Sequence, residues 1–271
     1  MKKIAFVKMV AAGNDFVIAE NLKGNLAKLA KEICQRKTGI GADGLLVLEK
    51  SRRADYKMRV FNPDGSEAEM CGNGARCMAL YISKAKKIKR QHFVLETLSG
   101  LIEAKVEKDN SFINMGIPQD IKLEVALNLT DGQIGVSSIN TGVPHAVVFP
   151  PRLREGEVIS LGREIRYHPK FAPRGTNVDF VEPIKRDLIK VRTYERGVEN
   201  ETLACGSGSV AAAIITFLKN LPSRKKGNFT MQVLTLSTEI LKVHFDFIKE
   251  KIFNVWLEGK ARMVCKGEYY V

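Results

Sequence analysis

The sequence contains no apolar run long enough to cross a membrane. A membrane-spanning helix needs ~18 consecutive apolar residues, and no stretch of the 271-residue chain approaches that length. The basic N-terminus, MKKIAFVKMV, is not typical of a secretion signal, because Lys8 interrupts its apolar stretch and a polar GNDF motif follows directly. We therefore predict a cytoplasmic protein with no membrane partner.

Cysteine and histidine are both scarce. Five cysteines without a dense spacing pattern are typical of free thiols in a reducing compartment. The four histidines follow no metal-binding spacing, and no C-x-x-C motif, P-loop or G-x-S-x-G motif is present. Nothing distinguishes one lysine as a site for pyridoxal phosphate. We predict no metal and no cofactor. Outside the motifs described below, Cys34, Cys77 and Cys265 are predicted to be buried as small apolar side chains.

Acidic residues are outnumbered, and the formal net charge is +13. Such a charge suits nucleic-acid binding, but the excess is spread along the chain and its densest run, KAKKIKR at 84–90, contains no aromatic residue. A solvated basic surface is the favoured interpretation, and we predict no nucleic-acid partner. A basic RNA-binding protein remains the alternative from a different class, and steep loss of binding with salt would identify it.

One glycine motif has the wrong surroundings for the function it suggests. Residues 39–44 read GIGADG, a literal G-x-G-x-x-G. In a dinucleotide-binding fold this loop follows a strand and begins a helix. Here a basic helical stretch precedes the loop and the apolar stretch LLVLE follows it. The order is reversed, so nucleotide binding is not predicted.

Two cysteines begin matched glycine-rich stretches 134 positions apart. The first reads CGNGARCMALYISKAKK from Cys71, and the second reads CGSGSVAAAIITFLKN from Cys205. In each, small residues that permit a tight turn lead into good helix formers. The N-terminus of a helix carries partial positive charge, which favours a thiolate and binds a carboxylate. Two such thiols suit proton removal from one face of a carbon and return on the other.

The remaining pattern indicates a duplicated α+β chain. GNDFV at 13–17 has an echo in TNVDFV at 176–181, and a strand and polar turn precede each Cys-Gly motif. Helices are expected at 24–37, 74–87 and 207–220, among many short strands; 121–129 is ambiguous. Strands in such excess favour antiparallel halves over a doubly wound sheet. Gly and Pro in 114–120 mark the expected boundary between the halves.

These residues together resemble the diaminopimelate epimerase family. The segments that carry the resemblance are GNDF at 13–16, TGIGADGLL at 38–46, FNPDGSEAEMCGNGARC at 61–77, TGVPHAVVF at 141–149, RGTNVDFV at 174–181 and YERGVENETLACGSGSVAAA at 194–213. The resemblance implies two pseudo-symmetric halves, each a curved, mostly antiparallel sheet around a central helix, with the active site in the cleft between them. It implies halves at 1–117 plus 260–271 and at 118–259, and a homodimer.

The resemblance also implies a reaction and a set of site residues. The reaction is cofactor-independent interconversion of L,L- and meso-diaminopimelate, a precursor of lysine and peptidoglycan, by a thiol and thiolate pair. Catalytic roles fall on Cys71, Cys205, Glu195 and His145, and substrate-binding roles fall on Asn14, Asn62, Gly72, Asn73, Asn177, Glu195, Arg196, Gly206 and Ser207. A proline-type two-cysteine racemase of the same fold remains the nearest alternative.

Four parts of the sequence depart from the family pattern. Many members carry HGxGNDF, where this chain reads Val10-Ala11-Ala12-Gly13-Asn14. Gly44 stands where some members carry glutamine, and Val143 stands where some carry asparagine. Cys265 corresponds to a tyrosine often found at a dimer contact. These departures leave the two cysteines untouched, but they bear on recognition of the distal end of the substrate and on the dimer.

Overall fold

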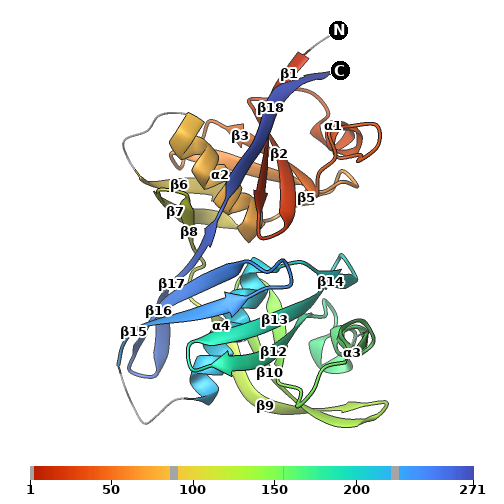
Figure 1. The fold of residues 1–271 in the computed structure, drawn as a ribbon, viewed down its shortest axis with the longest axis vertical. Helices are drawn as coiled ribbons and strands as arrows, with labels where there is room; N and C mark the ends of the chain where they lie inside the picture. Colours follow the sequence, from red (N-terminus) through yellow and green to blue (C-terminus); the bar gives the residue numbers. More distant parts are fainter. Residues whose placement is uncertain (1–2, 86–90, 155, 221–225) are drawn as a thin grey trace. The chain divides into compact units, whose positions relative to one another are not determined.

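The chain divides into two compact units, each described separately below (Figure 1). The computed structural model describes residues 3–85, 91–154, 156–220 and 226–271. Unit 1 comprises Met1–Asn114 with Glu258–Val271, and unit 2 comprises Met115–Leu257. These boundaries lie at 114/115 and 257/258, where the sequence predicts 117/118 and 259/260. Among the described residues, no helix is both long and apolar enough to span a membrane.

Unit 1 is built mainly of strands with two helices. Its helices are α1 (Leu26–Ile33) and α2 (Gly72–Ala85). Its strands are β1 (Lys3–Ala11), β2 (Asn14–Glu20), β3 (Gly44–Glu49), β4 (Tyr56–Phe61), β5 (Glu67–Ala68), β6 (His92–Thr97), β7 (Gly100–Glu107), β8 (Asn110–Asn114) and the C-terminal β18 (Arg262–Tyr270).

Unit 2 has the same kinds of elements. Its helices are α3 (Glu157–Arg166), the short 3-10 helix η1 (Pro169–Phe171) and α4 (Gly206–Lys219). Its strands are β9 (Gln119–Leu129), β10 (Gly132–Asn140), β11 (Pro144–Val148), β12 (Asn177–Lys185), β13 (Leu188–Glu195), β14 (Asn200–Thr202), β15 (Gly227–Leu234) and β16 (Ile240–Ile248). The last strand, β17 (Lys251–Lys260), leads out of unit 2.

The two units repeat one pairing pattern. In unit 1, β1 pairs antiparallel with β2, β2 parallel with β3, β3 antiparallel with β4, and β4 antiparallel with β5 and parallel with β6. In unit 2, β10 to β15 show the same senses in the same order. The α+β class with two similar halves, predicted from the sequence, is therefore confirmed.

One strand completes the repeat by an unexpected route. In unit 2, β9 directly precedes β10 in the chain and pairs antiparallel with it. In unit 1, the second antiparallel partner of β1, besides β2, is β18 from the far end of the chain. The segment 121–129, ambiguous from the sequence, belongs to β9 because β10 gives it a hairpin partner. Unit 1 thus depends on the C-terminus for a strand that unit 2 takes from its own start.

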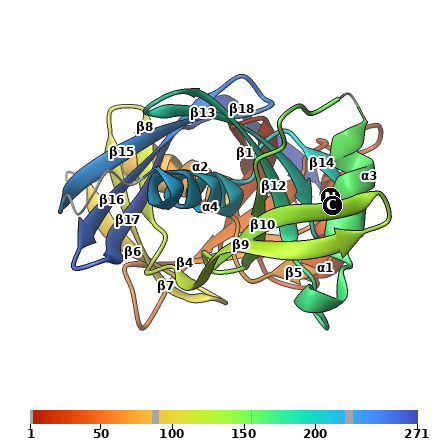
Figure 2. The ribbon, with the colours of Figure 1, turned by 90° about the horizontal axis from the view of Figure 1, so that it is seen from below.

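Each unit encloses one long helix. Residues Asn73–Ile82 of α2 are all buried, and α2 packs against strands of unit 1 that include β1, β7 and β8. In unit 2, α4 is buried from Gly208 to Thr216 and packs against β10 to β13, β15 and β16 (Figure 2). A helix that is apolar on every side needs such an enclosure. The structure begins α2 at Gly72, and residues 86 and 87 of the predicted helix 74–87 lie outside the described residues.

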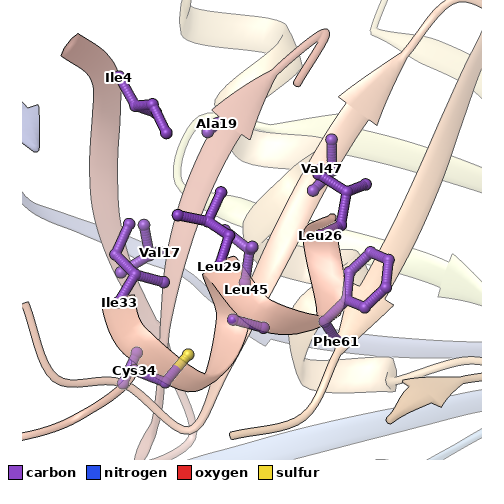
Figure 3. Close-up of a cluster of buried hydrophobic side chains, with 12 residues drawn as sticks. Ile4, Val17, Ala19, Leu26, Leu29, Ile33, Cys34, Leu45, Val47 and Phe61 are labelled. Atoms are coloured by element: carbon purple, nitrogen blue, oxygen red, sulfur yellow. The ribbon is translucent and has the colours of Figure 1, made fainter. Parts of the chain in front are cut away.

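A second helix packs on another face of each sheet. In α1, the spacing of Leu26, Leu29, Ala30 and Ile33 forms an apolar stripe that packs on β2, β3 and β4 (Figure 3). Cys34 joins this cluster and is buried, as predicted, and Cys77 is buried within α2. The helix is shorter than the predicted 24–37, because Asn25 caps it and the chain turns after Cys34.

Helix α3 was missed by the sequence analysis. It packs on β12 and β13 in a cluster with Val158, Ile165 and Tyr194. Gly162 in its middle weakens helix propensity, but a Cβ at this position would lie 2.5 Å from the Cβ of Tyr194. The glycine that hides the helix in the sequence is thus the residue that lets it approach the sheet.

The predicted burial of Cys265 is wrong. Cys265 is exposed on β18, where every residue from Arg262 to Glu268 is exposed. This strand pairs with β1, but its side chains from Arg262 to Glu268 stay exposed, whereas Tyr269 packs against the core cluster of unit 1. An apolar pattern in a strand predicts burial only when a packed layer faces it.

Candidate active site

Each of the two matched cysteines caps the helix that follows it. In unit 2, the Cys205 sulfur accepts a hydrogen bond from the backbone N–H of Gly208 at 3.4 Å, and Ser209 N donates to the Cys205 carbonyl at 2.9 Å. In unit 1, Gly74 N donates to the Cys71 sulfur at 3.4 Å, and Ala75 N donates to the Cys71 carbonyl at 2.8 Å. Both helices have 14 residues, so both sulfurs lie at the positive end of a substantial helix dipole.

The surroundings of Cys205 are polar and almost fully buried. Ser207 Oγ lies 3.5 Å from the Cys205 sulfur and 3.0 Å from His145 Nε2. His145 Nδ1 lies 2.7 Å from Asp179 Oδ2, and the side chains of both residues are 0% exposed. The Thr193 hydroxyl donates to Asp179 Oδ1 at 2.7 Å. Strands β11, β12 and β13 and helix α4 therefore each contribute one or more side chains to a single network.

The electrostatics of this network oppose ionisation of Cys205. Burial raises the pKa of the Cys205 thiol well above its usual range, and the negative charges of Glu195 and Asp179 raise it further. Burial also raises the pKa of the Glu195 carboxyl, while the nearby His145 acts in the opposite direction. Burial and these two carboxylates therefore disfavour the Cys205 thiolate, while hydrogen bonds from Ser207 and Gly208 act in the opposite direction.

At the start of α2, amide side chains form the network that Ser207 takes part in at the start of α4. Asn73 follows Gly72 and is buried; its amide donates to Asn14 Oδ1, and Asn14 in turn donates to Asp43 Oδ2 at 3.1 Å. The guanidinium of Arg76, which is completely buried, donates to Asn73 Oδ1 at 2.7 Å. Asn14 and Asn73, predicted separately from the sequence, thus belong to one network.

Acidic residues near Asn14 are neutralised by cations. Arg36 donates to both Asp15 and Asp43, and Lys8 Nζ lies 2.9 Å from Asp15 Oδ2. Burial acts to raise the pKa of Asp15, but the hydrogen bonds from Arg36 and Lys8 outweigh it and lower that pKa to about 2. Asp15 and Asp43 are therefore both held as ion pairs at the start of β2 and β3.

The other predicted binding residues fall in two places. In unit 2, Asn177 Oδ1 accepts from the backbone N–H of Arg196 at 2.8 Å, so Asn177 lies beside the Glu195–Arg196 pair. Gly206 is buried in the first turn of α4. In unit 1, Asn62 is exposed in the 62–66 turn, where its amide donates to Ser66 Oγ at 3.0 Å. Among the residues that the structure describes, Asn62 lies in a turn and forms no hydrogen bond with another predicted site residue.

Sequence reasoning missed a duplicated Thr-Leu-Ser turn that anchors both cysteine loops. In unit 1, Ser99 N donates to Glu69 O at 3.2 Å, and in unit 2, Ser237 N donates to Leu203 O at 2.9 Å. Each acceptor lies two residues before its cysteine. Within each turn the threonine hydroxyl contacts the serine hydroxyl, Thr97 to Ser99 and Thr235 to Ser237. The identical tripeptide at 97–99 and 235–237 could have revealed the pair.

A second missed repeat is a paired arginine and glutamate before each cysteine. Arg59 on β4 donates through Nε and Nη2 to both carboxylate oxygens of Glu67 on β5. Arg192 on β13 does the same to Glu201 on β14. Both glutamates stand four residues before a cysteine, and bidentate pairs of this kind are strong and directional. They fix the short strand that delivers each thiol.

The second glycine of each Cys-Gly motif packs against a neighbouring side chain, and that side chain differs between the two units. A Cβ on Gly208 would lie 2.2 Å from Asp179 Oδ1, whereas a Cβ on Gly74 would lie 3.1 Å from Leu46 Cδ2. The strand registers agree with this correspondence. On β12, Asn177 pairs with His145, and on β3, Gly44 pairs with Phe16. Asp179 lies two residues after Asn177, and Leu46 lies two residues after Gly44. Leu46 is therefore the counterpart of Asp179.

The positions that depart from the family pattern are close to these elements. Gly44 begins β3, and a Cβ there would lie 3.0 Å from Phe61 O and 3.3 Å from Phe16 Cδ1. Val143 lies in the turn between β10 and β11, where its carbonyl accepts from Thr141 N.

Within the described ranges, no group of three or more His, Cys, Asp or Glu side chains could hold a metal ion.

The contrast between the two glycines is testable. We expect Gly208→Ala to destabilise the protein by roughly 1–3 kcal/mol, the usual cost of overpacking, because the buried Asp179 carboxylate must move. Gly74→Ala should cost less, since the end of the Leu46 side chain can rotate. Urea unfolding followed by circular dichroism measures both. Equal losses in the two variants would show that contact with Asp179 does not decide the requirement for glycine.

Comparison with known proteins identifies the family to which this chain belongs. A sequence model described as diaminopimelate epimerase matches residues 6–121 and 137–244. The diaminopimelate epimerase of Aquifex aeolicus is 42% identical over 97% of this chain and 96% of its own length. That of Methanothrix thermoacetophila is 39% identical over 98% of this chain and 96% of its own.

Solved structures show the same fold at much lower identity. A PhzF-family phenazine biosynthesis protein from Bacillus anthracis matches with a TM-score of 0.76 at 16% identity, covering 100% of both chains. A hydroxyproline epimerase from Agrobacterium vitis matches with a TM-score of 0.70 at 16% identity, covering 98% of this chain and 92% of its own. With both glycine-flanked cysteines in place and close sequence relatives along nearly its whole length, this chain belongs to the diaminopimelate epimerase family of isomerases.

Proposed function

We propose that this protein interconverts L,L- and meso-diaminopimelate without pyridoxal phosphate or metal, using Cys71 and Cys205 as its two proton carriers. The observation that carries the proposal is the matched pair of cysteines, each held by the N-terminus of a 14-residue helix. Relatives that are diaminopimelate epimerases by name extend over nearly the whole chain. The proposal requires both thiols to reach one α-carbon of the bound substrate.

The chemistry follows from the weak acidity of that carbon. With no electron sink, developing negative charge must be stabilised by fixed dipoles. A helix N-terminus provides such dipoles and binds carboxylates. We therefore assign the α-carboxylate to the backbone N–H groups at the start of each helix, namely those of Gly72, Asn73, Gly206 and Ser207. One cysteine removes the α-proton as a thiolate, and the other donates its proton to the opposite face.

Polar side chains are assigned to the rest of the substrate. Arg196 suits the distal carboxylate because a planar guanidinium forms two parallel hydrogen bonds. Glu195 suits an ammonium group, and Asn14, Asn62 and Asn177 supply amides. His145 is assigned a supporting role near Cys205, because both residues lie within hydrogen-bond distance of Ser207. The enzyme is proposed to work in the cytoplasm, where thiols stay reduced.

Removal of either thiol tests the proposal. Cys71→Ala and Cys205→Ala should each abolish epimerisation, because neither thiol can serve both faces, while circular dichroism shows an intact fold. The assay is α-hydrogen exchange and epimerisation of L,L-diaminopimelate in heavy water with no cofactor added. As a control, Cys265→Ala changes an exposed thiol on β18 and should retain full activity. Near-normal epimerisation by either of the first two variants contradicts the two-thiol assignment.

A charge-conserving change at Arg196 tests recognition of the distal carboxylate. Arg196→Lys should lower kcat/KM by the equivalent of roughly 1.5–3 kcal/mol, the range for a hydrogen bond to a charged group, because an ammonium cannot replace the bidentate fork. The matched control is Arg186→Lys, at an exposed position in the turn between β12 and β13. If the two lysine variants behave alike, Arg196 does not bind the carboxylate.

We also propose a homodimer. The support is β18, which pairs with β1 and leaves Met263, Val264 and Tyr270 exposed, at 39%, 48% and 53%. An exposed edge strand of this kind can pair or pack with a second copy of the chain. Sedimentation equilibrium should give about twice the chain mass of 30.2 kDa, and Val264→Lys should shift the protein toward monomer. A wild-type protein that sediments as a monomer at micromolar concentration would exclude this dimer.

A further inference from the structure

Arg166, the last residue of α3, binds two segments of unit 2 that are separate in the sequence, 174–177 and 195–199. Its Nε and Nη2 donate to Glu199 Oε1 at 3.2 and 3.0 Å, and its Nη1 donates to the carbonyl of Arg174 at 3.2 Å. The Arg166 side chain is only 12% exposed, and a charge so buried is tolerated only when it is paired and hydrogen-bonded. One guanidinium therefore ties both segments to the end of α3.

The first segment, 174–177, lies directly against this guanidinium. Gly175 has a φ of 67°, and a Cβ at that position would overlap Arg166 Nη1. Glycine is thus the residue that permits so close an approach. Asn177, which is assigned to the substrate under the proposed function, follows two residues later at the start of β12. Contact with Arg166 therefore fixes the chain that delivers Asn177.

The second segment is the turn 195–199, which carries Arg196. Its last residue, Glu199, adopts a φ of 56°, which is uncommon for a residue with a side chain. The N–H of Glu199 donates to the Glu195 carbonyl at 2.8 Å, and its Oε1 accepts from Gly197 N at 3.0 Å. The carboxylate that binds the arginine of α3 therefore also holds the turn in its conformation.

The two segments also bind each other, beside the candidate ligand for the distal carboxylate. Asn177 Oδ1 accepts from the backbone N–H of Arg196 at 2.8 Å. Arg166 joins the segments at one place and this hydrogen bond joins them at another, so the contacts close a ring. Among the described residues, the partly buried Arg196 guanidinium forms no hydrogen bond or ion pair. Its backbone is held while its planar fork stays available to a carboxylate.

We propose that Arg166 is a positioning residue for recognition of the distal carboxylate, acting through Glu199 on the turn that presents Arg196. This inference rests on the proposed function, in which Arg196 binds that carboxylate. A bidentate contact is directional, and a short connecting turn is more mobile than the strands it joins. The ion pair to α3 supplies the constraint that the turn itself lacks.

Removal of the guanidinium tests the proposal. Arg166→Met keeps a long apolar side chain but releases Glu199. It should lower kcat/KM for diaminopimelate roughly 10- to 100-fold, the scale of an ångström-sized misplacement. The loss should lie mainly in KM, because the distal contact acts in the ground state and the transition state alike. The matched control is Arg163→Met, at an exposed position on the same helix, which should leave both constants unchanged.

A second substrate separates positioning from a structural role. Diaminopimelate with its distal carboxylate converted to an amide keeps the reacting end but lacks the charge that Arg196 binds. The wild-type protein should prefer the diacid, and Arg166→Met should lose most of that preference. The ratio of the two kcat/KM values does not depend on how much of the variant is folded. Equal losses with both substrates would assign Arg166 a structural role and overturn the proposal.

A double-mutant cycle tests whether Arg166 acts through Arg196. In an Arg196→Lys background, Arg166→Met should lower kcat/KM by less than about a further twofold, because coupled residues are not additive. Glu199→Gln removes the ion pair from the side of the turn and should show the same coupling, so it carries the test if Arg166→Met does not fold. Losses that multiply in full would show that α3 and Arg196 act independently, against the proposal.

The outcomes separate this inference from the function on which it rests. Wild-type protein that exchanges no α-hydrogen contradicts the proposed function, and the inference falls with it. An active protein whose Arg196→Lys variant is unimpaired removes the contact that Arg166 is proposed to position. An active protein that is impaired by Arg196→Lys but not by Arg166→Met leaves the function in place and overturns only the role of Arg166.

Discussion

Each thiol accepts a hydrogen bond from the N-terminus of a buried helix, and most of the structure serves to hold that helix still. Gly74 and Gly208 donate these bonds at 3.4 Å. Sulfur is a weak acceptor, so the geometry must be set by the surroundings and not by the bond itself. Burial of α2 and α4 within their sheets, the Arg–Glu pairs and the Thr-Leu-Ser turns all provide that constraint.

The same backbone arrangement surrounds the two thiols with different chemistry. Leu46 packs against Gly74 in the first turn of α2, and Asp179 packs against Gly208 in the first turn of α4. The strands that pair beside them carry Phe16 in one unit and His145 in the other. Similar helix dipoles therefore act in both units, while the side chain packed against the second glycine is apolar in unit 1 and ionisable in unit 2. The repeated fold fixes the position of each thiol within its own unit, and a few side chains on β2, β3, β11 and β12 differ between the units.

Much of the fold follows from local patterns in the sequence. The Cys-Gly motifs predict both central helices because small residues stand directly before helix formers. The order of elements around residues 39–44 argues against a dinucleotide-binding fold from the sequence alone. Helix α3 was missed because Gly162, needed for contact with Tyr194, removes its helical signature. Cys265 was misjudged because burial depends on a facing layer, which the strand's own sequence does not record.

The candidate site was less accessible to sequence reasoning than the fold. Asp179 stands within the TNVDFV motif, yet nothing in the motif shows that its side chain points to His145, which lies 34 residues away in the chain. The side chains of Asn14 and Asn73 meet across 59 residues for the same reason. Contacts between strands depend on register, and one residue of slip turns a side chain to the other face. The Thr-Leu-Ser and Arg–Glu repeats, by contrast, could have been recognised in the sequence by comparing its two halves again.

The duplication within one chain has a consequence for how such a site can diverge. Two identical half-length chains that associated symmetrically would have to give both thiols the same neighbours, because a single substitution would alter both copies. Here the two halves share one polypeptide, and Leu46 and Asp179 occupy corresponding places with opposite character. Each half can therefore accumulate its own substitutions. Covalent fusion converts an obligatory symmetry into two separately adjustable acid–base environments on a common scaffold.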